Sequence, residues 1–281
     1  MILDALIDAL KDCAIALPFL FGVYLLMEAL EKNSQLLAGK LFRKSEYFGP
    51  LFASVLGLIP QCGFSAAMSN LYVGGVIGVG TLIAVFLATS DEAVLIMLSH
   101  PEAISKIWLL LLVKFIAGIV FGYILNFIFR KWKLRKEVGD ICQDEHCGCE
   151  ESRSILKPAI IHTLKILAWL FAITFALNIL IELIGTDKLA MMLGGNLFFQ
   201  PLITALLGLI PNCAVSVLFT ELYVSGSLSF ASTVAGLCSG AGLGLIVLFK
   251  MNKSKKECFI ITGVLYLCAA LTGIILNIIN L

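Results

Sequence analysis

Long apolar runs constrain the fold of this 281-residue chain more than any other feature of its sequence. A helix needs about 20 predominantly apolar residues to cross a bilayer core of roughly 30 Å. Hydrophobic residues make up 60% of the chain and charged residues only 14%, so such runs dominate the sequence. The sequence therefore predicts an all-α integral membrane protein. The predicted crossings lie near 12–30, 76–98, 107–129, 160–184, 227–249 and 258–279.

Two further apolar runs, 49–73 and 200–224, are interrupted near the middle by Pro60 and Pro211. Each arm has about 11 residues, or roughly 16 Å of helix, which reaches about halfway across the membrane. Proline lacks an N–H and disfavours helical geometry in the residue before it, so a second helix should begin just after each proline. We therefore expect each run to fold as a re-entrant helical hairpin.

The two interrupted runs are copies of one another. GLIPQCGFSAAMSNLYVGG begins at Gly57 and GLIPNCAVSVLFTELYVSG at Gly208, and 10 of the 19 aligned positions are identical. The identities include Gly, Pro, Cys, Ser and Tyr, so a shared apolar character does not explain them. We conclude that the chain is duplicated, with membrane repeats at 1–129 and 158–281 and a basic, Cys/His-rich linker at 130–157.

The charges of the loops predict how the halves are oriented. The segments 31–48, 130–136 and 250–256 are rich in Lys and Arg, whereas 99–106 and 185–195 contain one Lys each. By the positive-inside rule the first three are cytoplasmic and the other two external. Corresponding loops then lie on opposite sides, which predicts inverted-topology repeats, each with three transmembrane helices and one broken hairpin. This plan is typical of alternating-access carriers.

A cysteine lies where the second arm of each hairpin should begin, Cys62 in one half and Cys213 in the other. A helix N-terminus favours the thiolate form, which is a ligand for soft metals. We predict that this cysteine pair binds the substrate or a metal; the alternative is that each fills a helix crossing as a small buried residue. The predicted substrate site also includes Pro60, Gln61, Ser65, Pro211, Asn212 and Ser216, and the hydroxyl stripe continues to Ser69 and Thr220.

Charged residues interrupt two of the predicted crossings. The run ATSDEAV places Asp91 and Glu92 in an apolar segment whose repeat partner reads SGAGLGL. Carboxylates inside a membrane often mark a proton route, so we predict that these two couple transport to protons. Alternatively, the helix ends early and they cap it at the external face. Lys114 lies roughly 10 Å from the external end of its helix, close enough to snorkel or to pair with a carboxylate.

The linker contains the dense soft-ligand sequence ICQDEHCGCEES. Thiolates and imidazoles at this density bind zinc, copper or metalloid ions, but the spacing matches no standard zinc finger. A cytosolic loop that captures metal and a loop without a defined site both remain open. The candidate metal ligands are Cys142, His146, Cys147 and Cys149.

The repeated segments GLIPQCG and GLIPNCA, the chain length, the spans and the Cys/His-rich loop resemble the ten-helix heavy-metal exporters related to the arsenical permeases. The resemblance extends over essentially the whole chain. It implies efflux of a toxic metal or metalloid, such as arsenite or an organoarsenical, driven by proton exchange. Ala214 of the second half stands where the first half has a glycine after its cysteine. The resemblance therefore does not imply equal roles for the two halves. Manganese export is an alternative, which paired thiols disfavour because a hard ion prefers oxygen ligands.

Other function classes also remain open. One is a transmembrane thiol–disulfide electron conduit, which would form a Cys62–Cys213 disulfide, and another is a carrier for a sulfur-containing anion. We expect no enzymatic activity, no cofactor, and a location in the plasma (inner) membrane with the linker cytoplasmic. The expected partners are the lipid bilayer and a metal or metalloid ion; a net charge of +1 indicates no nucleic acid, and homo-oligomerisation is left open.

Overall fold

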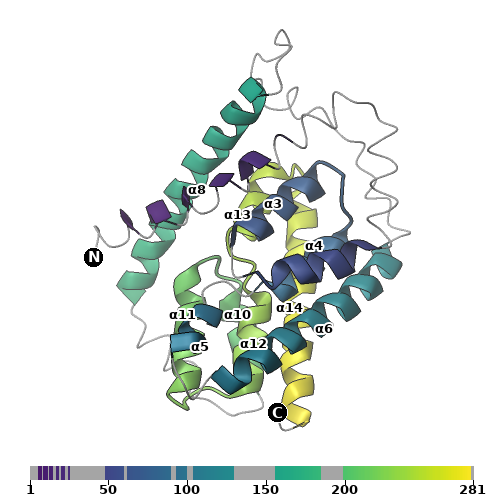
Figure 1. Ribbon diagram of the computed structural model, residues 1–281, viewed down its shortest axis with the longest axis vertical. Helices are drawn as coiled ribbons and strands as arrows, with labels where there is room; N and C mark the ends of the chain where they lie inside the picture. The colour runs from purple at the N-terminus through teal and green to yellow at the C-terminus, as the bar shows by residue number, and fades with distance from the viewer. Residues whose placement is uncertain are drawn as a thin grey trace.

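The chain is described here by a computed structural model that covers residues 6–7, 9–11, 13–14, 17–18, 20–22, 25, 48–59, 62–89, 93–99, 104–129, 156–184 and 199–279. Within these residues every regular element is a helix, so the all-α prediction is confirmed (Figure 1). After the helix Phe48–Gly57, the elements are α3 (Cys62–Val73), α4 (Val79–Ala88), α5 (Ala93–Ser99), α6 (Ile104–Phe129), α8 (Leu156–Ile184), α10 (Gln200–Gly208), α11 (Cys213–Val224), α12 (Phe230–Ser239), α13 (Leu243–Met251) and α14 (Lys255–Ile278).

The duplication in the sequence reappears in the helix boundaries. Adding 151 to both ends of α3 gives the ends of α11, adding 151 to both ends of α4 gives those of α12, and α6 and α14 begin 151 residues apart. Even the turns agree. Gly75 and Gly226 follow α3 and α11 with φ of 75° and 76°, values that glycine adopts without strain. The next residues, Val76 and Ser227, donate their N–H groups back to the last helical turn at 2.9 Å.

Two helices form the centre of the molecule and two long helices flank them. All ten residues of α4 and all ten of α12 are buried, as expected for largely apolar helices that carry no charged residue. By contrast, α6 and α14 are buried along one stripe only. On α6, Trp108 is 79% exposed and Phe127 is 78% exposed. Outward-facing apolar side chains of this size suit lipid tails rather than water.

The long helices approach the central ones closely at matching glycines. A Cβ on Gly122 of α6 would lie 2.9 Å from Ala84 Cβ of α4. A Cβ on Gly273 of α14 would lie 2.6 Å from Ala235 Cβ of α12. Both pairs are related by a shift of 151 residues, so the two halves use the same small-residue packing.

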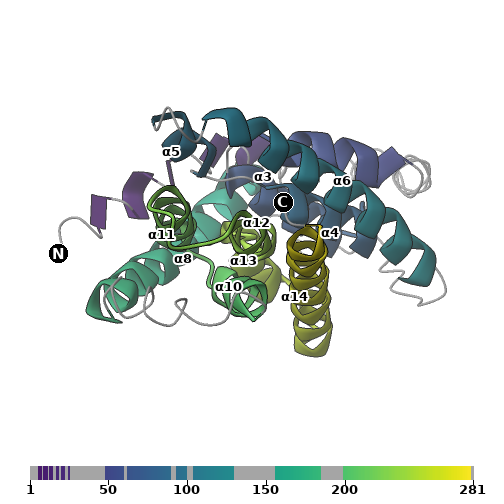
Figure 2. The ribbon, with the colours of Figure 1, turned by 90° about the horizontal axis from the view of Figure 1, so that it is seen from below.

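The two halves interlock instead of forming separate lobes. In Figure 2, α12 and α13 lie in the middle, between first-half helices α3, α4 and α6 and second-half helices α10 and α14. Helix α13 packs against α3, and α11 packs against α5, so each half contributes to the packing of the other. Along one side, α8 packs with described residues of the N-terminal segment through Cys13, Leu20, Ile166 and Leu170.

The structure modifies two of the predicted crossings. The segments 76–98 and 227–249 were each expected to be one crossing, but the first is divided into α4 and α5 and the second into α12 and α13. Glycine causes the second division, since Gly240 ends α12 and Gly242, with φ 50° and ψ −135°, precedes α13. Among the described residues, three stretches are long and apolar enough to cross a membrane: Ile104–Phe129, Phe230–Met251 and Lys255–Ile278.

Candidate functional site

The helices that follow the two prolines begin at the predicted cysteines. Cys62 is the first residue of α3 and Cys213 the first residue of α11. In the second half, Asn212 caps the helix, because its side-chain oxygen accepts a hydrogen bond of 2.8 Å from the Ala214 N–H. Cys213 is half-buried and forms no disulfide, and its thiol lies at the start of the helix.

The hydroxyl stripes predicted on these helices point into the protein. Ser65 and Ser69 of α3 are both 0% exposed, and Ser216 and Thr220 of α11 are also buried. The Ser69 hydroxyl donates a 2.7 Å hydrogen bond to the Gly244 carbonyl at the start of α13. A Cβ on Gly240 would lie 3.6 Å from Ser216 Oγ. Both stripes therefore border the division between α12 and α13, one from each half.

The two divided helices supply backbone polar groups at the centre of the protein. Thr89, the C-cap of α4, is 1% exposed, and Ala93, the first residue of α5, is 0% exposed. Ser239 at the end of α12 is buried as well, as are Gly240 and Ala241 between α12 and α13. Irregular backbone at membrane depth is tolerated where protein covers it or where it lines a cavity. These divisions are consequently the places where ion-binding carbonyls are expected.

Lys114 of α6 joins both divisions. Its ammonium donates a hydrogen bond to the carbonyl of Thr89, and a second one of 2.8 Å to the carbonyl of Leu237 in the last turn of α12. The side chain is 0% exposed, so the first of its two expected roles, snorkelling to the surface, is wrong, whereas pairing with a carboxylate stays a prediction. The sequence offered one signal for this role, a lysine in the middle of an apolar helix, but gave no indication of its acceptors.

Several predicted site residues lie outside the described part of the chain. This applies to Pro60, Gln61, Asp91 and Glu92, to the side chain of Cys62, and to the linker residues Cys142, His146, Cys147 and Cys149. Predictions about them stay predictions. Among the side chains that are described, no group of three or more His, Cys, Asp and Glu residues gathers to hold a metal ion. The described helices α3 and α11 do not pack along one another; α3 packs on α4 and α13, and α11 on α5, α10 and α12.

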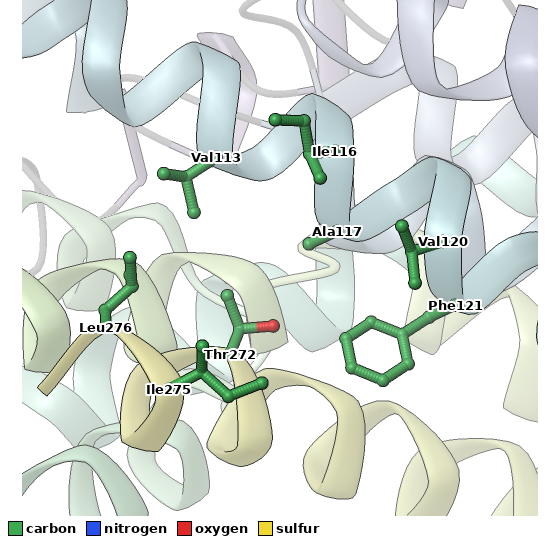
Figure 3. A pocket seen from close by; sticks show the side chains of 8 residues that line it. All are labelled: Val113, Ile116, Ala117, Val120, Phe121, Thr272, Ile275 and Leu276. Carbon is green, nitrogen blue, oxygen red and sulfur yellow. The ribbon is translucent and has the colours of Figure 1, made fainter. Parts of the chain in front are cut away.

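A cleft of about 230 Å³ lies between α6 and α14 (Figure 3). Its lining is apolar, and the single hydroxyl, that of Thr272, donates to the Cys268 carbonyl of its own helix at 2.8 Å. No thiol or carboxylate lines it. This cleft therefore suits hydrocarbon and not a metal ion. Its lining residues are Val113, Ile116, Ala117, Val120, Phe121, Thr272, Ile275 and Leu276.

Comparison with known proteins agrees with this architecture. A family model described as "Putative, 10TM heavy-metal exporter" matches residues 1–183 and 167–281, which together extend over the chain. No curated protein and no solved structure matches. With its central divided helices, its lipid-suited outer helices and this match, the chain belongs to that ten-transmembrane-helix heavy-metal exporter family.

Proposed function

We propose that the protein exports a soft metal or metalloid species, such as arsenite or an organoarsenical, through a site that contains Cys62 and Cys213. The observation that carries this proposal is the position of Cys213. Its thiol begins α11, and the hydroxyl face of that helix borders the division between α12 and α13. A thiolate at a helix N-terminus is a strong ligand for soft ions, whereas Mn²⁺ prefers oxygen ligands.

The export mechanism in this proposal is alternating access by two inverted repeats. Reciprocal packing supports it, since α3 contacts α13 of the other half while α11 contacts α5 of the first half. A twofold axis relating the halves produces contacts of this kind. The charges of the loops indicate how the protein is oriented in the membrane, with the basic linker on the cytoplasmic side of the plasma membrane. Rocking of one repeat against the other would then expose the site to each side in turn.

Coupling to protons through Asp91 and Glu92 is part of the same proposal. These residues connect Thr89 to Ala93, and both of those flanking residues are buried. Buried flanks favour the intramembrane interpretation over a cap at the external face. A proton arriving at the site competes with a thiolate-bound cation, so exchange of a proton for the metal follows from ordinary ligand chemistry.

The test is uptake of arsenite and antimonite into inverted membrane vesicles with an imposed pH gradient. Cys213→Ser and Cys62→Ser are each expected to reduce uptake by roughly tenfold or more, because a hydroxyl does not replace a thiolate ligand. The matched control is Cys258→Ser, since that buried cysteine donates to the Leu248 carbonyl at 3.6 Å and a hydroxyl can do the same. Normal uptake by the double cysteine variant, or transport of Mn²⁺ alone, would refute the soft-metal site.

A cysteine-trapping experiment distinguishes the electron-conduit alternative. That function requires a Cys62–Cys213 disulfide, whose Cα atoms must lie within about 7 Å. Acid quenching followed by thiol alkylation preserves any such bond. We expect the two cysteines to be alkylated in the resting membrane, because Cys213 takes part in no disulfide in the structure. A protein recovered as the Cys62–Cys213 disulfide would favour the conduit.

A further inference from the structure

The ammonium of Lys114 lies where two helix C-termini meet. Thr89 is the C-cap of α4, and Leu237 belongs to the last turn of α12, so both acceptors carry the negative end of a helix dipole. In carriers with discontinuous helices, the carbonyls at such ends coordinate the coupling cation. Here a side chain of the protein, that of Lys114, supplies the positive charge.

The arrangement is not symmetric. The position of the second repeat that corresponds to Lys114 is Leu265 of α14, which is also 0% exposed. One half thus supplies a charge where the other supplies an aliphatic side chain. The ammonium bridges the repeats, because Thr89 belongs to the first half and Leu237 to the second. Only the bond to Leu237 joins the two halves, so a movement of one half against the other acts on that bond.

Burial makes this charge costly unless it is compensated. A fully buried ammonium persists only when hydrogen bonds and dipoles replace its hydration. Among the described residues, Cys238 of α12 is an ionisable group within reach of this charge. Asp91 and Glu92 belong to the segment after Thr89 that the structure does not describe. The carbonyls of Thr89 and Leu237 are acceptors that a small monovalent cation would use equally well.

From these contacts we infer that Lys114 is a tethered cation, which occupies the monovalent-cation position between the C-terminal ends of α4 and α12. The protein consequently needs no Na⁺ at this position, and its transport cycle runs without Na⁺. The statement about transport rests on the proposed exporter function. The statement about the cation position does not, since occupancy alters the stability of the folded protein whether or not the protein transports anything.

The experiment removes the tethered charge and supplies a free one. Lys114→Ala leaves the two carbonyls and the space of the side chain, so small cations should bind there. The purified variant is heated in detergent with choline, Na⁺, ammonium or methylammonium as the only monovalent cation. We expect its unfolding midpoint to rise by about 3 °C when Na⁺, ammonium or methylammonium is present at roughly ten times its dissociation constant. The parent protein should show no such rise.

Three further variants make the outcome decisive. Leu265→Ala truncates the matching buried position in the second repeat. This variant should be less stable than the parent, and its unfolding midpoint should be the same with every cation. Lys114→Met fills the space without charge, and should be less stable than the parent and insensitive to cations. Lys114→Arg keeps the charge, and should not respond to cations either. If Lys114→Ala does not remain folded in choline, the expected equivalent is recovery of monodisperse protein with Na⁺, ammonium or methylammonium but not with choline.

Several results would overturn the inference. One is a Lys114→Ala midpoint that responds to cations no more than that of Leu265→Ala. Another is Lys114→Met protein that is as stable as the parent, because the charge would then be dispensable. In vesicles, metal uptake by the parent should be equal in choline and in Na⁺ buffers, and a Na⁺ requirement would contradict the tethered-cation role. Failure of all metal uptake would contradict the exporter function while leaving the stability results to decide on the cation position.

Discussion

Replacing Gly273 with alanine should weaken the contact that holds α14 against α12. The added Cβ would lie 2.6 Å from Ala235 Cβ, 2.8 Å from Pro201 Cβ and 3.0 Å from the Ala231 carbonyl oxygen. None of these atoms is the flexible end of a long side chain, so the helices themselves must move apart. Overpacking of this kind costs about 1–3 kcal/mol.

The same helix provides a control for the change in helix propensity. A Cβ on Gly263 would meet nothing within 4 Å, so Gly263→Ala should gain about 1 kcal/mol from better helix propensity without a clash. Gly273→Ala receives the same gain but also bears the overpacking cost. We therefore expect the two variants to differ by about 2 kcal/mol in favour of Gly263→Ala.

Thermal unfolding in detergent, followed by size-exclusion chromatography of heated samples, measures the difference. At about 2–4 °C per kcal/mol, the midpoint of Gly273→Ala should lie roughly 4–8 °C below that of Gly263→Ala. Gly122 of α6 is the matching position in the first repeat, so Gly122→Ala should behave like Gly273→Ala. Its added Cβ would lie 2.8 Å from Pro50 Cβ and 2.9 Å from Ala84 Cβ. Equal midpoints for the two α14 variants would show that these helices do not approach as closely as described.

Three other predictions concern the helix divisions, the junction of α3 with α14, and the linker. Gly242→Ala should lower the unfolding midpoint by the equivalent of about 1–3 kcal/mol, because φ of 50° with ψ of −135° strains any residue with a Cβ; an unchanged midpoint would contradict the backbone geometry. Tyr72→Phe should cost about 1–3 kcal/mol because it removes the hydroxyl that donates to the buried Glu257 carboxylate, whereas Tyr223→Phe at the matching position should have little effect; equal costs would argue against the bond. Deleting 139–152 should leave metal uptake at saturating substrate largely intact, since capture of metal is accessory to translocation; total loss of uptake with normal membrane insertion would place the transport site in the linker.

Local steric rules explain which parts of the site were predictable from sequence. A proline in the middle of an apolar run disfavours helical geometry in the residue before it for local steric reasons, and helices α3 and α11 begin just after the two prolines, at Cys62 and Cys213. Asn212 is a favourable N-cap residue for equally local reasons. Gly75 and Gly226 terminate the same helices, because glycine adopts positive φ without strain.

The sequence by itself determined the helical class, the membrane setting and the duplication, because apolar run length and repeated residues need no knowledge of the packing. Only the tertiary structure decided that Lys114 lies between Thr89 and Leu237, which are 25 residues before it and 123 residues after it. A lysine in an apolar helix can snorkel, pair with a carboxylate or bind carbonyl groups, and its flanking residues are compatible with all three. The outcome depends on where α4 and α12 end and on the close packing of α6 against both. Those contacts join segments far apart in the chain, so no pattern within one segment contains them.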